Sequence, residues 1–355
     1  MSWLRLLACV WICGASAGCG DDPAAGNDGS APGDGATAID GGSSDRSPDL
    51  SPDRADGGTG VWVSGTYSND QGQRDYWVYV PSGYQPATPV PLVVVLHGCT
   101  VTVDQQEAGT RYTALADTRT FLVVYPVQSS LANPGLCWNW FDSGNQQRGK
   151  GEPSLIAGIT STVMKTWSID AKKVYVIGPS AGGAMSVILG ATYPDLIAAI
   201  GVVAGCEYAG QPCGPTGGPD PATQGPLAYQ AMTSFARPMP VIVFHGDADP
   251  VAAPINGQQV TAQWLSTNDY ADDGLHNGSV STTATSTATL QVPNGRSYDL
   301  SRYDDQAGAL LIESFVVHGA GHAWPGGPAS ATFTDPTGPD ATTLSYDFFL
   351  AHARP

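Results

Sequence analysis

A strand that runs directly into a glycine-rich turn constrains this chain more than any other feature of its sequence. Residues 174–177 read VYVI, which suits a buried strand, and residues 178–182 read GPSAG. Small and apolar residues that suit a helix follow at once. A G-x-S-x-G turn between a strand and a helix holds a serine hydroxyl exposed on a strained backbone, and the close approach of the two elements favours glycine on either side. The context predicts a nucleophile at Ser180.

The flanking elements, more than the motif itself, support this prediction, because the chain contains a second match. Residues 14–18 read GASAG within an N-terminal apolar segment. No strand-like run precedes them and no helix-like run follows. We interpret that second match as accidental.

The first 19 residues have the layout of a secretory signal. One positive charge, Arg5, precedes an apolar run over residues 6–12 and then small residues ahead of Cys19. Residues 16–19 read SAGC and resemble a bacterial lipobox, in which Cys19 would be lipidated and become the mature N-terminus. Such boxes usually carry leucine where Ser16 stands, so plain secretion with cleavage nearby is the alternative. The apolar run is far shorter than the ~20 residues of a membrane-spanning helix.

Residues 20–60 consist mostly of Gly, Asp, Ser, Ala and Pro. Such a composition cannot bury enough apolar surface to offset the entropy of ordering, so we expect a flexible tether followed by one catalytic domain over residues 61–355. The formal net charge of −17 argues against nucleic acid or an anionic membrane surface as partners. We expect an exported monomer whose only membrane contact would be a lipid on Cys19.

Four cysteines lie beyond the signal: Cys99, Cys137, Cys206 and Cys213. An even set in an exported protein suggests two disulfides, and four cysteines allow three pairings. The close spacing of Cys206 and Cys213 favours a local loop bridge, which would leave Cys99 with Cys137. The chain has no C-x-x-C pair, so a zinc site is not expected. We predict neither a metal nor a cofactor.

From residue 61 onward, strand-like and helix-like runs alternate. The expected strands are residues 76–80, 91–96, 121–125, 174–177, 197–203, 239–244 and 310–317, and the expected helices are residues 105–118, 153–167, 254–265 and 340–352. Alternation of this kind predicts an α/β domain with a mostly parallel sheet covered by helices on both faces. Residues 268–300 are the least regular region, and residues 282–290 could form an edge hairpin or a surface insertion.

A serine needs a base to remove its proton and an acid to orient that base. Acidic residues follow the expected strand 239–244, in the sequence HGDADPV over residues 245–251. The order Ser, Asp, His along the chain is that of α/β-hydrolases. We favour Asp249 as the acid over Asp247, because hydrolases with a Gly-x-x-Asp turn use its last residue. Asp247 is then expected to cap the turn with its own side chain.

Two histidines compete for the role of base in the sequence HGAGHAWPG, which covers residues 318–326 after another expected strand. Histidine can accept and return a proton near neutral pH. His318 ends a strand, whereas His322 lies in a glycine loop that could bring its ring to the serine. We therefore predict His322 as the base. His245, His276 and His352 are interpreted as structural or surface residues.

The oxygen that becomes negative during ester cleavage needs backbone N–H donors. Residues 96–99 read LHGC and end an apolar strand with a tight turn. We predict that the amides of Cys99 and Ala181 form this oxyanion hole. His97 either orders the turn by hydrogen bonding or fills space beneath it.

Five separated motifs together resemble the extracellular polyhydroxybutyrate depolymerase family, which shares its catalytic domain with feruloyl and acetylxylan esterases. They are LHGCT at residues 96–100, CWNWF at 137–141, QRG at 147–149, GPSAGG at 178–183 and GHAWPG at 321–326. The likeness covers residue 61 to the C-terminus. It implies an α/β-hydrolase fold, a triad of Ser180, Asp249 and His322, and no metal.

The resemblance also bears on the substrate. Trp138, Trp140 and Trp324 lie inside the motifs, and indole faces suit both an aliphatic polyester and a feruloyl ring, although each could instead pack in the core. Better known depolymerases carry a polyester-adhesion module beyond the catalytic domain, whereas this chain ends about thirty residues after His322. Soluble oligomers and other accessible esters therefore become more plausible substrates.

The leading hypothesis is a secreted serine esterase, tethered to the cell surface, that hydrolyses polyhydroxyalkanoate-type esters of 3-hydroxybutyrate through an acyl-enzyme. A feruloyl or acetylxylan esterase acting on plant polysaccharide is the alternative within the same fold. A non-catalytic surface lipoprotein that uses its cleft for binding is the alternative from another class.

Overall fold

The computed structural model describes residues 59–355. The predicted signal, Cys19 and nearly all of the tether lie outside the described residues. Within them, no helix combines the length and the apolar character that a bilayer crossing requires.

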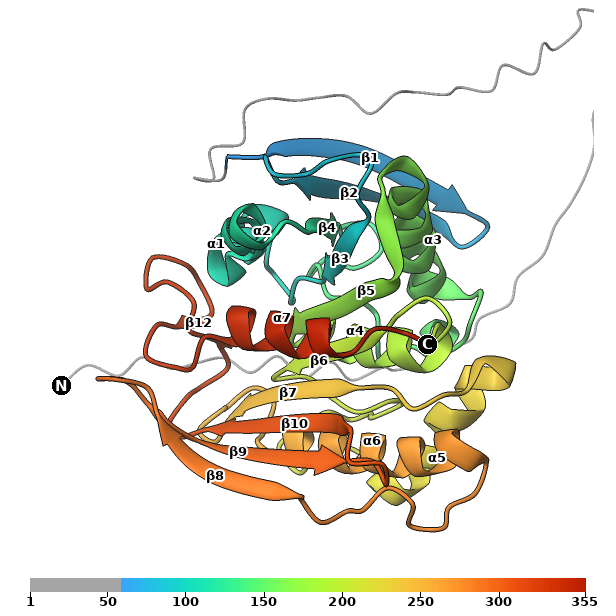
Figure 1. Ribbon diagram of the computed structural model, residues 1–355, viewed down its shortest axis with the longest axis vertical. Helices are drawn as coiled ribbons and strands as arrows, with labels where there is room; N and C mark the ends of the chain where they lie inside the picture. Colours follow the sequence, from blue (N-terminus) through green and yellow to red (C-terminus); the bar gives the residue numbers. More distant parts are fainter. Residues whose placement is uncertain (1–58) are drawn as a thin grey trace, which may run out of the picture. The chain divides into compact units, whose positions relative to one another are not determined.

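A ten-stranded sheet organises the described residues, in the order β1-β2-β4-β3-β5-β6-β7-β10-β9-β8 (Figure 1). The six central strands run parallel, and the strands at both edges are antiparallel. The prediction of a mostly parallel sheet is confirmed. The strands are β1 (Val61–Asn69), β2 (Gly72–Val80), β3 (Val90–Val95), β4 (Leu122–Pro126), β5 (Ile169–Pro179), β6 (Ala199–Val203), β7 (Val241–Gly246), β8 (Ser286–Gln291), β9 (Ser297–Asp304) and β10 (Leu310–Val317).

Helices cover both faces of this sheet. They are α1 (Val103–Thr110), α2 (Tyr112–Arg119), α3 (Gly151–Thr166), α4 (Ala181–Thr192), α5 (Pro221–Met232), α6 (Ile255–Asp273) and α7 (Ala341–Ala351). Alternate residues of the central strands enter different cores. In β3, Val94 belongs to the core that includes residues of α3, α4, α5 and α6, whereas Val93 and Val95 belong to the core that includes residues of α1, α2 and α7. Helix α7 contacts β5, β6 and β7 (Figure 1). Burial on both sides explains why these strands are continuous apolar runs.

The structure differs from the predicted elements in several places. The helix expected at residues 105–118 is two helices, because Arg111 adopts a left-handed φ of 56° between them. Helix α5 and strand β1 were not predicted, and α6 continues to Asp273, beyond the expected end at residue 265. The irregular region forms the edge hairpin β8–β9, although its strands begin after residue 282 and extend well past residue 290.

Candidate active site

The G-x-S-x-G segment forms a strained turn between β5 and α4. Ser180 adopts φ 54° and ψ −122°, a conformation that costs energy for a residue with a side chain, and α4 begins at the next residue. The neighbouring glycines allow the end of β3 to pass close by. A β-carbon added to Gly178 or Gly182 would lie 2.5 Å or 2.4 Å from the Leu96 carbonyl oxygen. The backbone thus has the geometry that the sequence context predicts.

A histidine and a carboxylate from two other loops meet near this turn. The His322 Nδ1 atom lies 2.7 Å from the Asp249 Oδ2 atom, and the Asp249 side chain is fully buried. The other carboxylate oxygen accepts hydrogen bonds from the Val251 and Ala252 N–H groups at 2.8 and 3.0 Å. Burial alone would raise the pKa of Asp249, but these hydrogen bonds and the His322 charge outweigh it, so the pKa is lowered. An ionised Asp249 accepts a hydrogen bond from the His322 Nδ1–H and so fixes the imidazole tautomer.

One cavity of about 200 Å³ connects these groups. Ser180 and His322 both line it, together with Gly98 and Cys99 from the turn after β3. A β-carbon on Gly98 would lie 3.6 Å from the Ser180 β-carbon, so this turn lies directly against the serine. The remaining walls come mainly from α1 and the residues just before it, from the segment that follows β10, and from Val251 in the loop after β7. The structure therefore brings the predicted serine, histidine, carboxylate and turn to one site.

The turn after β3 is held by hydrogen bonds from His97, one of the two alternatives considered from the sequence. The His97 Nδ1 atom lies 2.9 Å from the Gly98 carbonyl oxygen, and the Nε2 atom accepts from the Gln128 N–H at 3.0 Å. Burial lowers the pKa of His97, so the neutral ring can donate at one nitrogen and accept at the other. A disulfide between Cys99 and Cys137 fixes the end of the turn that follows Gly98.

The second predicted disulfide, Cys206–Cys213, is also present, so the pairing favoured by the spacing is confirmed.

The prediction for Asp247 was wrong. Instead of capping its own turn, Asp247 pairs with His318 at 2.9 Å and accepts the Gly319 N–H at 2.6 Å. The two loops therefore form a second His–Asp pair, outside the cavity.

The other histidines make structural contacts. The buried His245 Nε2 atom lies 2.8 Å from the Ala252 carbonyl oxygen and 3.6 Å from Asp249 Oδ2, which supports the loop that carries Asp249. His276 stacks on Tyr270, and His352 bonds to the Leu310 carbonyl oxygen. These positions agree with the structural or surface roles inferred from the sequence.

Residues 74–285, more than half of the chain, match the model of the family described as Esterase PHB depolymerase. The chain belongs to the esterase PHB depolymerase family.

Relatives of this family member include two kinds of ester hydrolase. Poly(3-hydroxyalkanoate) depolymerase C of Paucimonas lemoignei is 34% identical over 273 residues, which cover 74% of this chain and 62% of that protein. Acetylxylan esterase A of Talaromyces purpureogenus is 32% identical over 230 residues, covering 59% of this chain and 58% of that protein. The chain thus spans about three fifths of the length of these relatives.

A solved structure supports the fold of this esterase PHB depolymerase family member. An acetyl xylan esterase from Aspergillus awamori aligns with a TM-score of 0.62 and 20% identity, covering 78% of this chain and 94% of that one. This likeness confirms the predicted α/β-hydrolase fold.

The three tryptophans predicted to contact substrate have different surroundings. Trp324 lines the cavity and donates its indole N–H to the Thr342 hydroxyl at 3.0 Å. Trp138 is fully buried beneath the turn after β3, with its ring centroid 5.4 Å from that of His97, so its predicted role as a substrate wall is corrected to core packing. Trp140 is half-buried against the core beside Phe141, and it is not among the residues that line the cavity.

Two exposed apolar residues at the cavity were missed from the sequence. Val251 is 62% exposed and Phe333 is 55% exposed, and both line the cavity. Phe333 lies outside the five family motifs and has a left-handed φ of 54°. The only signal for Val251 was its position two residues after Asp249.

Proposed function

We propose that this protein is a serine esterase whose catalytic residues are Ser180, His322 and Asp249. The 2.7 Å contact between His322 and the buried Asp249, beside a cavity that Ser180 also lines, is the observation on which the proposal mainly rests. Membership of the esterase PHB depolymerase family supports it. The strained backbone of Ser180 adds support, because strain of this kind clusters at functional sites.

In the proposed reaction, the Ser180 hydroxyl oxygen attacks the ester carbonyl carbon while His322 Nε2 takes its proton. Ionised Asp249 accepts the hydrogen bond from Nδ1–H and stabilises the imidazolium that forms. The carbon–oxygen bond to the leaving alcohol then breaks as His322 returns the proton to that alcohol, and an acyl-enzyme remains. Water attacks this acyl group in the same way, which releases the acid and restores Ser180.

The amides of Cys99 and Ala181 are the proposed donors to the carbonyl oxygen when it becomes negative. Ala181 is the first residue of α4, where backbone N–H groups lack partners within the helix and the helix dipole favours negative charge. Cys99 lines the cavity next to Gly98, whose backbone lies against Ser180. The two backbone N–H groups, one in the turn that follows β3 and one at the start of α4, can both donate hydrogen bonds to the negative oxygen.

For the substrate, we propose short polyhydroxyalkanoate-type esters such as 3-hydroxybutyrate oligomers. The likeness to a poly(3-hydroxyalkanoate) depolymerase over 74% of this chain supports this choice. Apolar side chains at the cavity, from Val251, Trp324 and Phe333, suit an aliphatic acyl chain.

Acetyl groups on xylan are the second candidate substrate, favoured by the acetylxylan esterase relatives and by a solved structure of that class.

We further propose that the enzyme is exported and anchored by a lipid on Cys19. Two disulfides support an oxidising compartment.

The test combines a variant with a substrate panel. Ser180→Ala should abolish hydrolysis of p-nitrophenyl butyrate while the circular dichroism spectrum and Tm stay those of the wild type. Retention of near wild-type turnover would remove Ser180 from the mechanism. Release of 3-hydroxybutyrate from its oligomers should exceed release of acetate from acetylated xylan or of ferulate from feruloylated xylan, and the reverse order would favour the second candidate or a feruloyl esterase. A folded wild type that cleaves no ester would favour a binding lipoprotein.

A further inference from the structure

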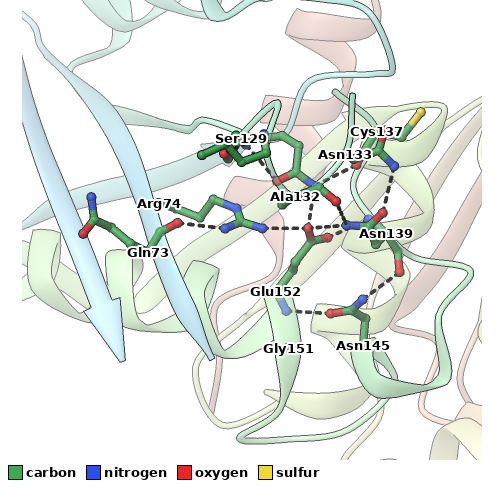
Figure 2. A network of polar contacts seen from close by, with 12 residues as sticks. Gln73, Arg74, Ser129, Ala132, Asn133, Cys137, Asn139, Asn145, Gly151 and Glu152 are labelled. Atoms are coloured by element: carbon green, nitrogen blue, oxygen red, sulfur yellow. Dashed lines mark hydrogen bonds and ion pairs between the residues drawn. The ribbon is translucent and has the colours of Figure 1, made fainter. Parts of the chain in front are cut away.

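A buried carboxylate outside the cavity lies at the centre of a polar network. Glu152, in the first turn of α3, accepts hydrogen bonds from Arg74 Nη2 at 2.9 Å, from Gln128 Nε2 at 2.5 Å, and from the Asn139 backbone and side chain at 2.6 and 2.9 Å. Figure 2 shows Arg74 and Asn139 converging on it from opposite sides. These partners come from β2 and from the segment after β4. Three of these donors converge on Oε1, and the Asn139 backbone N–H binds Oε2, so both carboxylate oxygens are engaged.

The network continues from Glu152 to the turn beside Ser180. The Gln128 side chain also donates to the Cys137 carbonyl oxygen at 2.7 Å, so both of its amide protons are committed. The Gln128 backbone N–H in turn donates to His97 Nε2, and His97 bonds to the Gly98 carbonyl oxygen. Three consecutive hydrogen bonds, through Gln128 and His97, thus link Glu152 to the backbone carbonyl that precedes the Cys99 amide.

The same segment supports the turn by a second route. The disulfide joins Cys99 to Cys137, and the Thr100 N–H donates to the Gly135 carbonyl oxygen at 2.7 Å. Asn139, two residues beyond Cys137, is held by Glu152 through both its backbone and its side chain. Both sides of the turn over residues 97–100 therefore rest on the segment of residues 127–139, and Glu152 anchors that segment at both ends.

We propose that Glu152 and Gln128 are positioning residues that hold the Cys99 amide at the place required for the oxyanion. The inference rests on the proposed function, because an oxyanion forms only if the protein cleaves esters. An oxyanion-hole donor acts only within a narrow range of distances, and complete loss of one typically lowers the rate by ~10² to 10³. Neither residue is among those that line the cavity, so their loss should weaken transition-state stabilisation without changing substrate binding.

The variants Glu152→Gln and Gln128→Met test this role in the full chain. Glu152→Gln places an amide donor among donors and leaves the buried Arg74 without its counter-charge, so it is the variant more prone to misfold. Gln128→Met keeps the length of the side chain and removes only its polar atoms. The matched control is Glu313→Gln, since buried Glu313 pairs with Arg302 at 2.7 Å across β9 and β10 and is not part of this network.

Active sites are first counted by titration with a fluorophosphonate, and kcat and KM for p-nitrophenyl butyrate are then measured per labelled site. We expect kcat to fall about 10-fold or more in both network variants, with KM within about twofold of wild type, and no change in the control. The affinity for a butylboronic acid, whose serine adduct places an oxygen in the oxyanion hole, should fall by the same factor as kcat.

Unchanged kcat and boronate affinity in folded Gln128→Met, or a loss confined to the number of labelled sites or to KM, would overturn the positioning role. If Glu152→Gln does not fold, Gln128→Met decides the question alone. Failure of the proposed function gives a different result, because the wild type itself would then neither hydrolyse the ester nor take up the label.

Discussion

Two histidine–aspartate pairs in this protein come from the same two loops and differ in what surrounds them. The Nδ1–Oδ2 distance is 2.7 Å in the pair of His322 and Asp249, and 2.9 Å in the pair of His318 and Asp247. In the first pair the side chains are 13% and 0% exposed, whereas in the second they are 36% and 39% exposed. The pairs are nearly identical in geometry but not in burial.

The ring nitrogen that does not face the aspartate also distinguishes the pairs. The His318 Nε2 atom lies 3.3 Å from a second carboxylate, that of Asp299, whereas the ring of His322 borders the cavity beside Ser180. The bond to Asp247 and then that to Asp299 raise the pKa of His318, which favours its charged form. A general base must start uncharged, so a His–Asp contact alone does not identify the catalytic pair. The catalytic pair is identified instead by the access of its histidine to the nucleophile and by the number of carboxylates near that histidine.

The largest expected effect comes from removing each histidine in turn. His322→Ala should lower kcat/KM for p-nitrophenyl butyrate by about 10⁵-fold or more, because the serine then lacks its base. His318→Ala should change kcat/KM by less than about threefold. Steady-state kinetics of both purified variants make the comparison, and a severe loss in His318→Ala with wild-type activity in His322→Ala would exchange the roles of the two pairs.

A smaller but still large difference is expected between the aspartates. Asp249→Asn should lower kcat about 10³- to 10⁴-fold, since an amide cannot hold His322 in the required tautomer or stabilise its charge. Asp247→Asn should leave kcat nearly unchanged. The measurement is single-turnover acylation by the same ester, and equal rates in the two variants would contradict the assignment of Asp249.

The exposed side chains of Val251 and Phe333 line the same cavity as His322, and they should affect substrate choice by a few-fold. Phe333→Ala removes exposed apolar surface from the cavity, so KM for p-nitrophenyl hexanoate should rise about three- to tenfold. The kcat and KM for p-nitrophenyl acetate should stay constant. Kinetics across a series of acyl lengths provide the test. Parallel changes for every acyl length would show that Phe333 has no selective role.

The exposed pair should contribute a small, pH-dependent stability. Hydrogen bonding to Asp247 raises the pKa of His318 above 6.5, and the bond from His318 lowers the pKa of Asp247 below 3.8. The stability that His318 contributes is fully present below its ordinary pKa and is lost as pH rises through its raised pKa. The stability that Asp247 contributes is present above its ordinary pKa and is lost as pH falls through its lowered pKa. The pair should therefore stabilise most near pH 5.

Thermal unfolding of wild type and His318→Gln checks this expectation. Because both side chains are exposed, the Tm difference should not exceed about 2 °C, should be largest near pH 5 and should shrink towards pH 9. High salt should reduce it further. A Tm difference that does not vary with pH would contradict the proposed ion pair.

Local chemistry explains which parts of the structure could be predicted from the sequence. The turn at residues 178–182 depends on glycines beside Ser180, and the buried strands are continuous apolar runs, so both features are visible in short windows. The loops that follow β7 and β10 are placed by the parallel sheet, which brings the carboxyl ends of its strands to one edge.

The missed features depend on contacts between distant residues. Helix α5 contains Gly225 and Pro226, both poor helix formers, but a β-carbon on Gly225 would lie 2.3 Å from the Ser266 hydroxyl of α6, so close helix packing requires glycine there. The partners of Glu152 come from residues 74, 128 and 139, and no sequence spacing links them. The pairing of Asp247 with His318 was missed because both residues lie beside stronger candidates for the same roles.

Activation of Ser180 by the His322–Asp249 pair can be observed in a single labelling experiment. The protein is treated briefly with a fluorophosphonate, and its peptides are mapped by mass spectrometry. We expect one adduct, on the peptide that contains Ser180, with labelling strongly slowed in His322→Ala and unaffected in His318→Ala. An adduct on another residue, or labelling of His322→Ala at the wild-type rate, would contradict it.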